Sequence, residues 1–299
     1  MPVPTSRSET ALLVVVAMLA FAGNSLLCRL ALKTTPLDPS TFTTVRLLSG
    51  AGALCLLQLW RARASVVNAA RLQETGALGG DWTSAAALFA YAALFSWAYV
   101  GLTAATGALL LFGAVQASMI AWGLLAGERL ALLQWAGLLL ALAGLVVLML
   151  PGLATPAWGN GLAMLAAGVA WGVYSLRGRR SGPDGDAPDP TRATAGNFAR
   201  AVPFTLALSA VMVHQAQLDI TGLWLAVASG AITSGLGYAI WYRAMPRLQA
   251  TQAASVQLCV PALAAVGAVP LVGEAFTWVL GISSVAILGG VALVLRQRN

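Results

Sequence analysis

The stretch that decides the fold is Leu124–Leu148, LLAGERLALLQWAGLLLALAGLVVL. One charged pair, Glu128 and Arg129, interrupts a run that otherwise carries no charge. Ions at the end of a membrane span lie near water and cost little, whereas ions at the centre of a span are costly. We therefore predict that one span ends near Gly127 and that the next begins at Glu128, where a carboxylate is favourable at a helix N-terminus. This interfacial role is preferred to a role of Glu128 in ion coupling.

The composition of the whole chain supports a membrane protein. Hydrophobic residues make up 59% of its 299 residues and charged residues only 9%, against about 25% charged residues in a typical soluble domain. Three long stretches carry no charge at all: 82–127, 130–176 and 248–273. An α-helix needs about 20 apolar residues to cross the hydrocarbon core of a bilayer. Because the apolar runs are continuous rather than alternating, the sequence predicts an all-α polytopic membrane protein and not a β-barrel.

Turn signals along the chain predict ten spans. The uncharged stretch 82–127 fits two helices joined near Gly101, and the stretch 130–176 divides at the turn 151–156. The six remaining spans are predicted near 11–31, 39–60, 200–217, 220–242, 249–272 and 276–295. The polar segment 177–195 is expected to be a mobile cytoplasmic loop.

Lysine and arginine are distributed unequally between the predicted loops. If both termini lie in the cytoplasm, thirteen arginines fall on the cytoplasmic side, and only Arg29 and Lys33 fall outside. An excess of positive charge in cytoplasmic loops sets the orientation of membrane proteins. We therefore predict cytoplasmic termini in a bacterial inner membrane. The net charge of +7 then follows from this topology and from anionic lipid headgroups, so no nucleic-acid partner is expected.

Two short motifs recur with one spacing. The dipeptide Gly-Glu at position 127 returns at position 273, and the tetrapeptide AMLA at 17–20 returns at 163–166, each 146 residues later. This recurrence predicts a duplication in which each copy has five spans. The two copies are residues 1–150 and 157–299. Because five is odd, the second copy enters the membrane inverted, and inverted repeats with a site near the bilayer midplane are typical of secondary transporters.

Four segments resemble a known family. They are GERLALLQWAGLLLALAGLVVL (127–148), GEAFTWVLGISSVAILGGVALVL (273–295), FTTVRLLSGAGAL (42–54) and AWGVYSLRGRR (170–180). With them the chain resembles the EamA-type drug/metabolite transporters over nearly its whole length. The resemblance implies that Arg46, Glu128 and Glu274, together with Trp171, belong to the shared scaffold. Arg46, Glu128 and Glu274 are expected to have structural roles. The segment GYAIWYRA (237–244) and the aromatic content are similar to the YddG-type exporters of aromatic amino acids.

Aromatic side chains repeat on helical faces in both predicted halves. Tyr91, Phe95 and Tyr99 lie at i, i+4 and i+8 in the third span, and Trp241 lies 146 residues after Phe95. The aromatic residues predicted to line a central cavity are Tyr91, Phe95, Trp171, Tyr174, Tyr238 and Trp241. Packing against lipid is the alternative for these side chains. Those expected in the aromatic belt at the membrane surface are Tyr99, Trp60, Trp82, Trp158 and Trp278.

Amide side chains inside the spans are the second kind of candidate binding residue. Because lipid penalises an amide, Asn24, Gln116 and Gln257 should face the interior, where they contact the substrate or bridge helices. An amide both donates and accepts hydrogen bonds. It therefore suits a zwitterion, whose side chain would be held by aromatic walls.

Arg46 is the only ion predicted well inside a span. It could snorkel to the surface, bond backbone carbonyls at a broken helix, or attract a carboxylate, and the resemblance favours a structural role. His214 is expected near the membrane surface. Three cysteines in different spans are expected to be free thiols that fill space.

The predicted function is that of a secondary transporter. We expect it to export small hydrophobic metabolites, above all aromatic or large apolar amino acids, by alternating access as a uniporter, because no acidic residue is predicted at the midplane. Export of other amino acids or drug-like compounds coupled to a proton gradient is the alternative. An enzyme acting on lipids is a further alternative, although one histidine and no carboxylate inside a span offer little for catalysis. The expected partners are a small-molecule substrate and the lipid bilayer, with no cofactor and a monomeric state.

Overall fold

The computed structural model describes residues 7–63, 79–102, 104–149, 158–179, 189–272 and 278–296, and within these ranges all regular structure is helical. The helices of the first part of the chain are α1 (Arg7–Thr34), α2 (Pro39–Arg63), α4 (Trp82–Gly101), α5 (Ala104–Leu125) and α6 (Leu132–Met149). Those that follow are α7 (Trp158–Arg179), α8 (Pro190–Val211), α9 (Ile220–Ala228), α10 (Gly237–Ala244), α11 (Ala250–Gln257), α12 (Cys259–Val272) and α13 (Trp278–Arg296).

These helices form ten spans, as predicted. Helix α9, the π-helical segment η3 (Ser229–Leu236) and α10 are continuous and form one span, and α11 and α12 form another, with only Leu258 between them. Neighbouring spans pack in both directions. Helices α6 and α13 are antiparallel, since Gly137 lies against Gly290 and Gly144 against Ala286, whereas α5 and α7 are parallel, since Gly168 lies against Leu111 and Gly172 against Ser118. The all-α polytopic fold class is therefore confirmed.

The seventh span begins ten residues earlier than predicted, at Pro190. A proline fits the first turn of a helix, because its missing N–H has no partner there in any case. Asp189 caps the helix by accepting a hydrogen bond of 3.2 Å from the N–H of Thr191. The prediction of a loop over 177–195 is therefore wrong at both ends. Polar composition indicated a loop there, but the side chains of Thr191 and Thr194 are buried between helices.

The outer surface of the bundle is largely apolar, while several polar side chains and the charge of Arg46 lie inside. Leu132 is 87% exposed and Trp278 is 84% exposed, whereas Arg46 and Trp241 are fully buried. This reverses the usual pattern of soluble proteins and suits lipid as the surrounding solvent. By length and composition only, the described helices that are both long and apolar enough to cross a membrane are Ser8–Thr34, Pro39–Arg61, Trp82–Gly101 and Ile220–Arg247. Shorter apolar helices are Leu110–Leu125, Leu132–Gly144 and Gly281–Val294.

One predicted surface aromatic residue is internal. Trp60, Trp82, Trp158 and Trp278 are exposed as expected. Tyr99 is only 7% exposed, and its ring centroid lies 4.7 Å from that of Phe95. The prediction that Tyr99 belongs to the surface belt is therefore wrong, because it continues the inward-facing stripe of α4 by one more turn.

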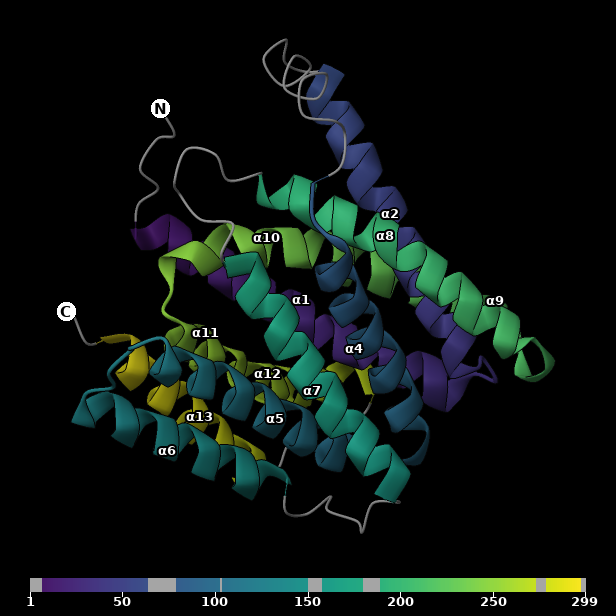
Figure 1. Cartoon of the computed structure of the whole chain (residues 1–299). Coiled ribbons are helices and arrows are strands. Elements are labelled where there is room, and N and C mark those ends of the chain that lie inside the picture. The colour runs from purple at the N-terminus through teal and green to yellow at the C-terminus, as the bar shows by residue number, and fades with distance from the viewer. Residues whose placement is uncertain are drawn as a thin grey trace.

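The helices that matter for the site lie in the middle of the bundle. Figure 1 shows the pair α6 and α13 on one side, the pair α2 and α8 on the other, and α1, α4 and α7 between them. Helices α6 and α13 approach so closely that a Cβ atom on Gly137 would lie 2.6 Å from the carbonyl oxygen of Gly290. Small residues allow such contacts between spans.

Candidate functional site: a central aromatic pocket

A small pocket, here called the central pocket, lies where six spans converge. Its lining residues are Phe21, Asn24, Ser25, Tyr91, Phe95, Leu111, Phe112, Trp171, Tyr238, Gln257 and Val260. Its free space of about 20 Å³ is about enough for one water molecule. In this structure, side chains therefore fill most of the space between these spans.

Aromatic rings form most of the pocket wall. The ring centroid of Phe21 lies 5.3 Å from that of Trp171, 5.5 Å from Tyr238 and 5.8 Å from Trp241, in each case edge to face. Tyr91 lies 4.9 Å from Trp171 on the other side. Such rings favour flat apolar groups and can stack on an aromatic solute.

Two amides place polar groups in this apolar wall. Trp171 Nε1 donates a hydrogen bond of 2.5 Å to Gln257 Oε1. Gln257 Nε2 donates in turn to the backbone oxygen of Ala253 at 3.1 Å. Asn24 Oδ1 accepts a hydrogen bond of 2.7 Å from Ser229 Oγ. In this structure these amides therefore bridge helices, which was the alternative to substrate contact.

The pocket gathers six of the nine predicted binding residues. They are Asn24, Tyr91, Phe95, Trp171, Tyr238 and Gln257. The other three are buried nearby but do not line it. Gln116 donates to the Ala254 oxygen at 2.5 Å and joins α5 to α11, Trp241 packs behind Phe21, and Tyr174 lies on the side of the arginine-rich end described below.

Some pocket residues escaped the sequence analysis. They are Phe21, Ser25, Leu111, Phe112 and Val260. Phe21, Asn24 and Ser25 lie at i, i+3 and i+4 on α1, so their shared face was a usable signal. Leu111, Phe112 and Val260 carry no such signal, because apolar residues also occur on every lipid-facing surface of this chain.

Arg46 lies directly behind the pocket wall and is fully buried. Its Nε donates to Ser234 Oγ at 2.9 Å, and its Nη2 donates to the Tyr238 hydroxyl at 2.7 Å. The guanidinium carbon lies 5.4 Å from the ring centroid of Tyr91, within the range of a cation–π contact. The burial of Arg46 contradicts the prediction that its side chain snorkels to the surface. The prediction of bonds to backbone carbonyls is also wrong for η3, because the bond from Arg46 goes to the hydroxyl of Ser234.

The π-helical segment η3 packs closely against α2 beside Arg46. Gly230 lies against the backbone oxygen of Arg46 and the hydroxyl of Ser49, so a side chain at position 230 would collide with α2. Helix α2 and η3 therefore touch through their backbones. π-Helical turns frequently occur at functional sites, and here one carries Ser234 to the guanidinium group.

A second hollow, here called the vestibule, lies toward the arginine-rich end of the bundle, which carries Arg61, Arg177, Arg200 and Arg243. The vestibule has a volume of about 160 Å³. Its lining residues are Gly80, Asp81, Ser84, Arg177, Gly178, Pro190, Ala193, Thr194, Asn197 and Tyr242. It is larger than the central pocket, and its lining includes the charged side chains of Asp81 and Arg177.

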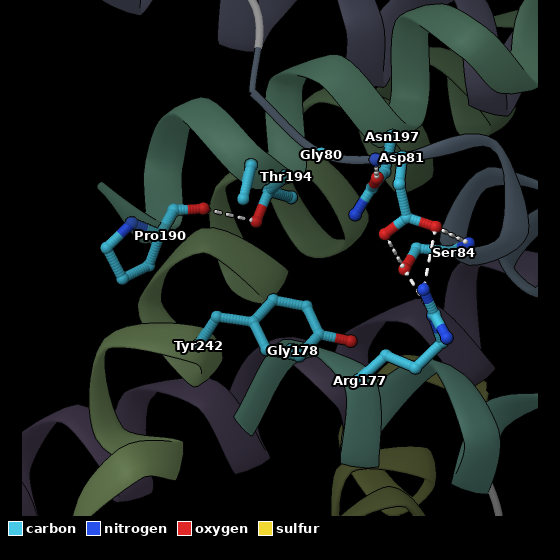
Figure 2. Close-up of a pocket in the computed structure, with 10 residues that line it drawn as sticks. Gly80, Asp81, Ser84, Arg177, Gly178, Pro190, Thr194, Asn197 and Tyr242 are labelled. Atoms are coloured by element: carbon cyan, nitrogen blue, oxygen red, sulfur yellow. Dashed lines mark hydrogen bonds and ion pairs between the residues drawn. The ribbon is translucent and has the colours of Figure 1, made fainter. Parts of the chain in front are cut away.

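An ion pair crosses the vestibule from α7 to the start of α4. Figure 2 shows Arg177 Nη2 2.9 Å from Asp81 Oδ1, while Asp81 also accepts hydrogen bonds from the N–H and hydroxyl of Ser84. Partial burial acts to raise the pKa of Asp81, but the hydrogen bonds from Ser84 and the charge of Arg177 outweigh it and hold the pKa below its ordinary value. Asp81 therefore stays ionised at neutral pH.

Two tyrosine rings separate the vestibule from the central pocket. Tyr242 lines the vestibule, and its ring centroid lies 5.2 Å from that of Tyr174. Tyr174 lies in turn 5.9 Å from Trp171, which lines the central pocket. We call Tyr174 and Tyr242 the tyrosine layer. Both side chains are buried.

Comparisons with known proteins agree with this architecture. Residues 158–296 match the EamA-like transporter family. The chain is 52% identical to an uncharacterized protein of Pseudomonas aeruginosa, over 97% of this chain and 96% of that protein. The chain belongs to the EamA-like transporter family. An uncharacterized transporter of Archaeoglobus fulgidus is 24% identical over 98% of this chain and 99% of its own.

A crystal structure of a protein that is 24% identical superposes on this EamA-like transporter with a TM-score of 0.73, over 97% of both chains. The fold is therefore shared with a solved structure. Family membership makes the chain a multi-pass membrane protein and a transporter, and it points away from an enzyme. It also implies a small-molecule substrate and a surrounding lipid bilayer.

Glu128 of this EamA-like transporter lies between α5 and α6, at the end of a span as predicted. Its carboxylate accepts hydrogen bonds from the N–H groups of Ala250 at 2.8 Å and Thr251 at 3.1 Å. Glu128 therefore stabilises the N-terminus of α11. Gly127 has a φ of 88°, which glycine adopts without strain. Glu274 lies outside the described residues.

The histidine and the cysteines are not part of the pocket. His214 is exposed on a short 3₁₀ turn after α8. Cys28, Cys55 and Cys259 are free thiols, as predicted. Among the described residues, no group of three His, Cys, Asp or Glu side chains is placed to hold a metal ion.

Proposed function

We propose that this EamA-like transporter exports aromatic or large apolar amino acids. The central pocket carries the proposal, because rings from α1, α4, α7 and α10 meet there with the amides of Asn24 and Gln257. Rings suit the side chain of such a solute, and amides can replace part of the water around its charged groups. A solute enters only after the rings move apart, since the pocket has room for about one water molecule.

Alternating access of two inverted halves, residues 1–150 and 157–299, is the proposed mechanism. This mechanism is supported by a common offset of 146 residues between equivalent positions of the two halves. Leu111 on α5 and Gln257 on α11 are 146 residues apart, and both line the pocket. Residues with this offset also meet in the pocket, because Ser25 and Trp171 both line it. Rocking of one half against the other would open the pocket to each side in turn.

The arginine-rich end is proposed to face the cytoplasm of a bacterial inner membrane. Positive charge accumulates on the cytoplasmic side of membrane proteins. The orientation can be tested with single cysteines at exposed positions of opposite ends, Gln215→Cys and Arg247→Cys, in a chain without its own cysteines. An impermeant maleimide added to spheroplasts, whose inner membrane is intact, should label the first and spare the second. The reverse result would overturn the orientation.

Uniport is proposed because no proton carrier faces the pocket in the described part of the chain. The described acidic side chains lie at or near helix ends, and Asp81, the acid of the vestibule, has a lowered pKa. In liposomes, an imposed pH or sodium gradient should therefore leave a zwitterionic substrate at its equilibrium level. Accumulation above that level would show coupling.

The protein is proposed to act as a monomer.

Counterflow into proteoliposomes tests the substrate class. Purified protein should exchange labelled tryptophan or phenylalanine for unlabelled tryptophan, and threonine should exchange at least about tenfold more slowly, because it fills little of the aromatic wall. Methylviologen, a dication, should not exchange. Faster exchange of threonine or methylviologen than of tryptophan would contradict the proposal.

A further inference from the structure

We infer that Arg46 binds the carboxylate of the transported solute, so that an anionic group is a requirement for recognition. The inference rests on the proposed function and makes its substrate class narrower. It changes the assignment of Arg46 from a scaffold residue to a specificity-determining residue. The observations that carry it are the incomplete bonding of this buried cation and its neighbours in the pocket wall.

The guanidinium group of Arg46 is buried without full compensation. It has no exposed surface, and its Nη1 has no hydrogen-bond partner. The ion pairs between described residues involve other arginines, namely Arg61, Arg177 and Arg243. A buried cation is costly unless an anion and complete hydrogen bonding compensate it. A carboxylate that arrives with the solute would supply both.

The position of Arg46 joins this cation to the central pocket. Three side chains around the guanidinium group also line the pocket: Tyr91, Phe95 and Tyr238. Ser234, which accepts from Arg46 Nε, also bonds Asn24 of the pocket at 3.4 Å. Only one layer of side chains therefore lies between the cation and the pocket. When those rings separate to admit a solute, the guanidinium group becomes part of the wall.

The bonds that Arg46 already makes leave its Nη1 without a hydrogen-bond partner. Nε is held by Ser234 and one hydrogen of Nη2 by Tyr238. The hydrogens of Nη1 and the second hydrogen of Nη2 remain for an incoming group. Two parallel N–H donors of this kind match the two oxygens of a carboxylate, and such paired ionic hydrogen bonds are among the stronger ones in proteins. Ser234 and Tyr238 thus hold the fork in a fixed orientation.

Competition in the wild-type protein tests the inference without any substitution. Counterflow of labelled tryptophan is measured against indole-3-propionate, which has the carboxylate but no amine, and tryptamine, which has the amine but no carboxylate. We expect indole-3-propionate to inhibit at a concentration at least about tenfold lower than tryptamine. Equal inhibition, or stronger inhibition by tryptamine, would overturn the role of Arg46 while tryptophan counterflow itself upholds the proposed function. Loss of all tryptophan counterflow would overturn both.

Substitution separates recognition from a purely structural role. In Arg46→Gln, the ratio of inhibition by indole-3-propionate to that by tryptamine should fall at least about tenfold, toward unity. Because this ratio does not depend on the amount of folded protein, reduced abundance alone leaves it unchanged. Arg46→Lys should retain part of the preference, since it keeps the charge but not the paired donors. Arg200→Gln, at the arginine-rich end, is the matched control and should keep the wild-type ratio. An unchanged ratio in Arg46→Gln would overturn the inference.

Discussion

The indole nitrogen of Trp171 donates its hydrogen bond to the amide oxygen of Gln257, which joins α7 to α11 at the wall of the central pocket. Both side chains are buried. A solute that enters the pocket meets a ring and an amide that are already fixed relative to one another. Because this pair is already held in place, little side-chain conformational entropy is lost when a solute binds.

Replacing Gln257 by Leu should lower tryptophan counterflow about tenfold or more. Leucine keeps most of the volume but removes the acceptor, so the Trp171 N–H is left buried and unpaired at a cost of about 1–3 kcal/mol. Gln116→Leu is the matched control. Gln116 is likewise a buried amide that bridges two helices, here α5 and α11, but it does not line the pocket. Both variants are compared at equal abundance in the membrane. Equal loss of counterflow in both would show that Gln257 acts only in packing.

Gly178 and Tyr242 should be energetically coupled. The edge of the Tyr242 ring lies where a Cβ atom on Gly178 would stand. Gly178→Ala should therefore displace the ring, disturb the tyrosine layer and slow counterflow several-fold, and it should have much less effect in a Tyr242→Ala background. Gly159→Ala, on the same helix with open space around it, should have little effect. Additive effects of Gly178→Ala and Tyr242→Ala would contradict the proposed contact.

The ion pair of Asp81 and Arg177 should contribute a small, pH-dependent part of the stability. Because the pKa of Asp81 is lowered in the folded protein, the contribution is present above the ordinary pKa of about 3.9 and is lost as the pH falls through the lower, folded value. For this partly exposed pair we expect about 0.5–1 kcal/mol.

The unfolding temperature in detergent checks this prediction. Asp81→Asn should lower it by a constant amount between pH 5 and 8, and the difference should shrink below about pH 4. Asp219→Asn is the control, because Asp219 caps α9 without an ion pair to a described residue. A difference that already changes between pH 6 and 8 would mean that Asp81 titrates there, and it would reopen proton coupling.

The number of spans was predictable because it depends on local composition. Uncharged apolar runs of sufficient length define helices before any tertiary contact is known. The start of α8 was missed because Thr191 and Thr194 are polar but buried, and burial between helices is a tertiary property. The inward faces of α4 and α10 were predictable from the spacing of their rings.

The finer design of the site was not predictable, because it joins residues that are far apart in the sequence. Arg46 and Ser234 are 188 positions apart, and Trp171 and Gln257 are 86 positions apart. The local sequence of η3 did not predict a π-helical turn. Periodicity assigns a residue to a helix face, but only the packing of the helices decides which partner it meets.

The central claim, that the pocket binds and moves aromatic amino acids, is tested most directly by tryptophan counterflow in Trp171→Ala and Trp224→Ala. Trp171 is 5% exposed in the pocket wall, and Trp224 is 67% exposed on the outer surface. Loss of stacking and of the bond to Gln257 should slow counterflow of Trp171→Ala about tenfold or more, while Trp224→Ala keeps nearly the wild-type rate at similar abundance. Equal rates in the two variants would contradict the account.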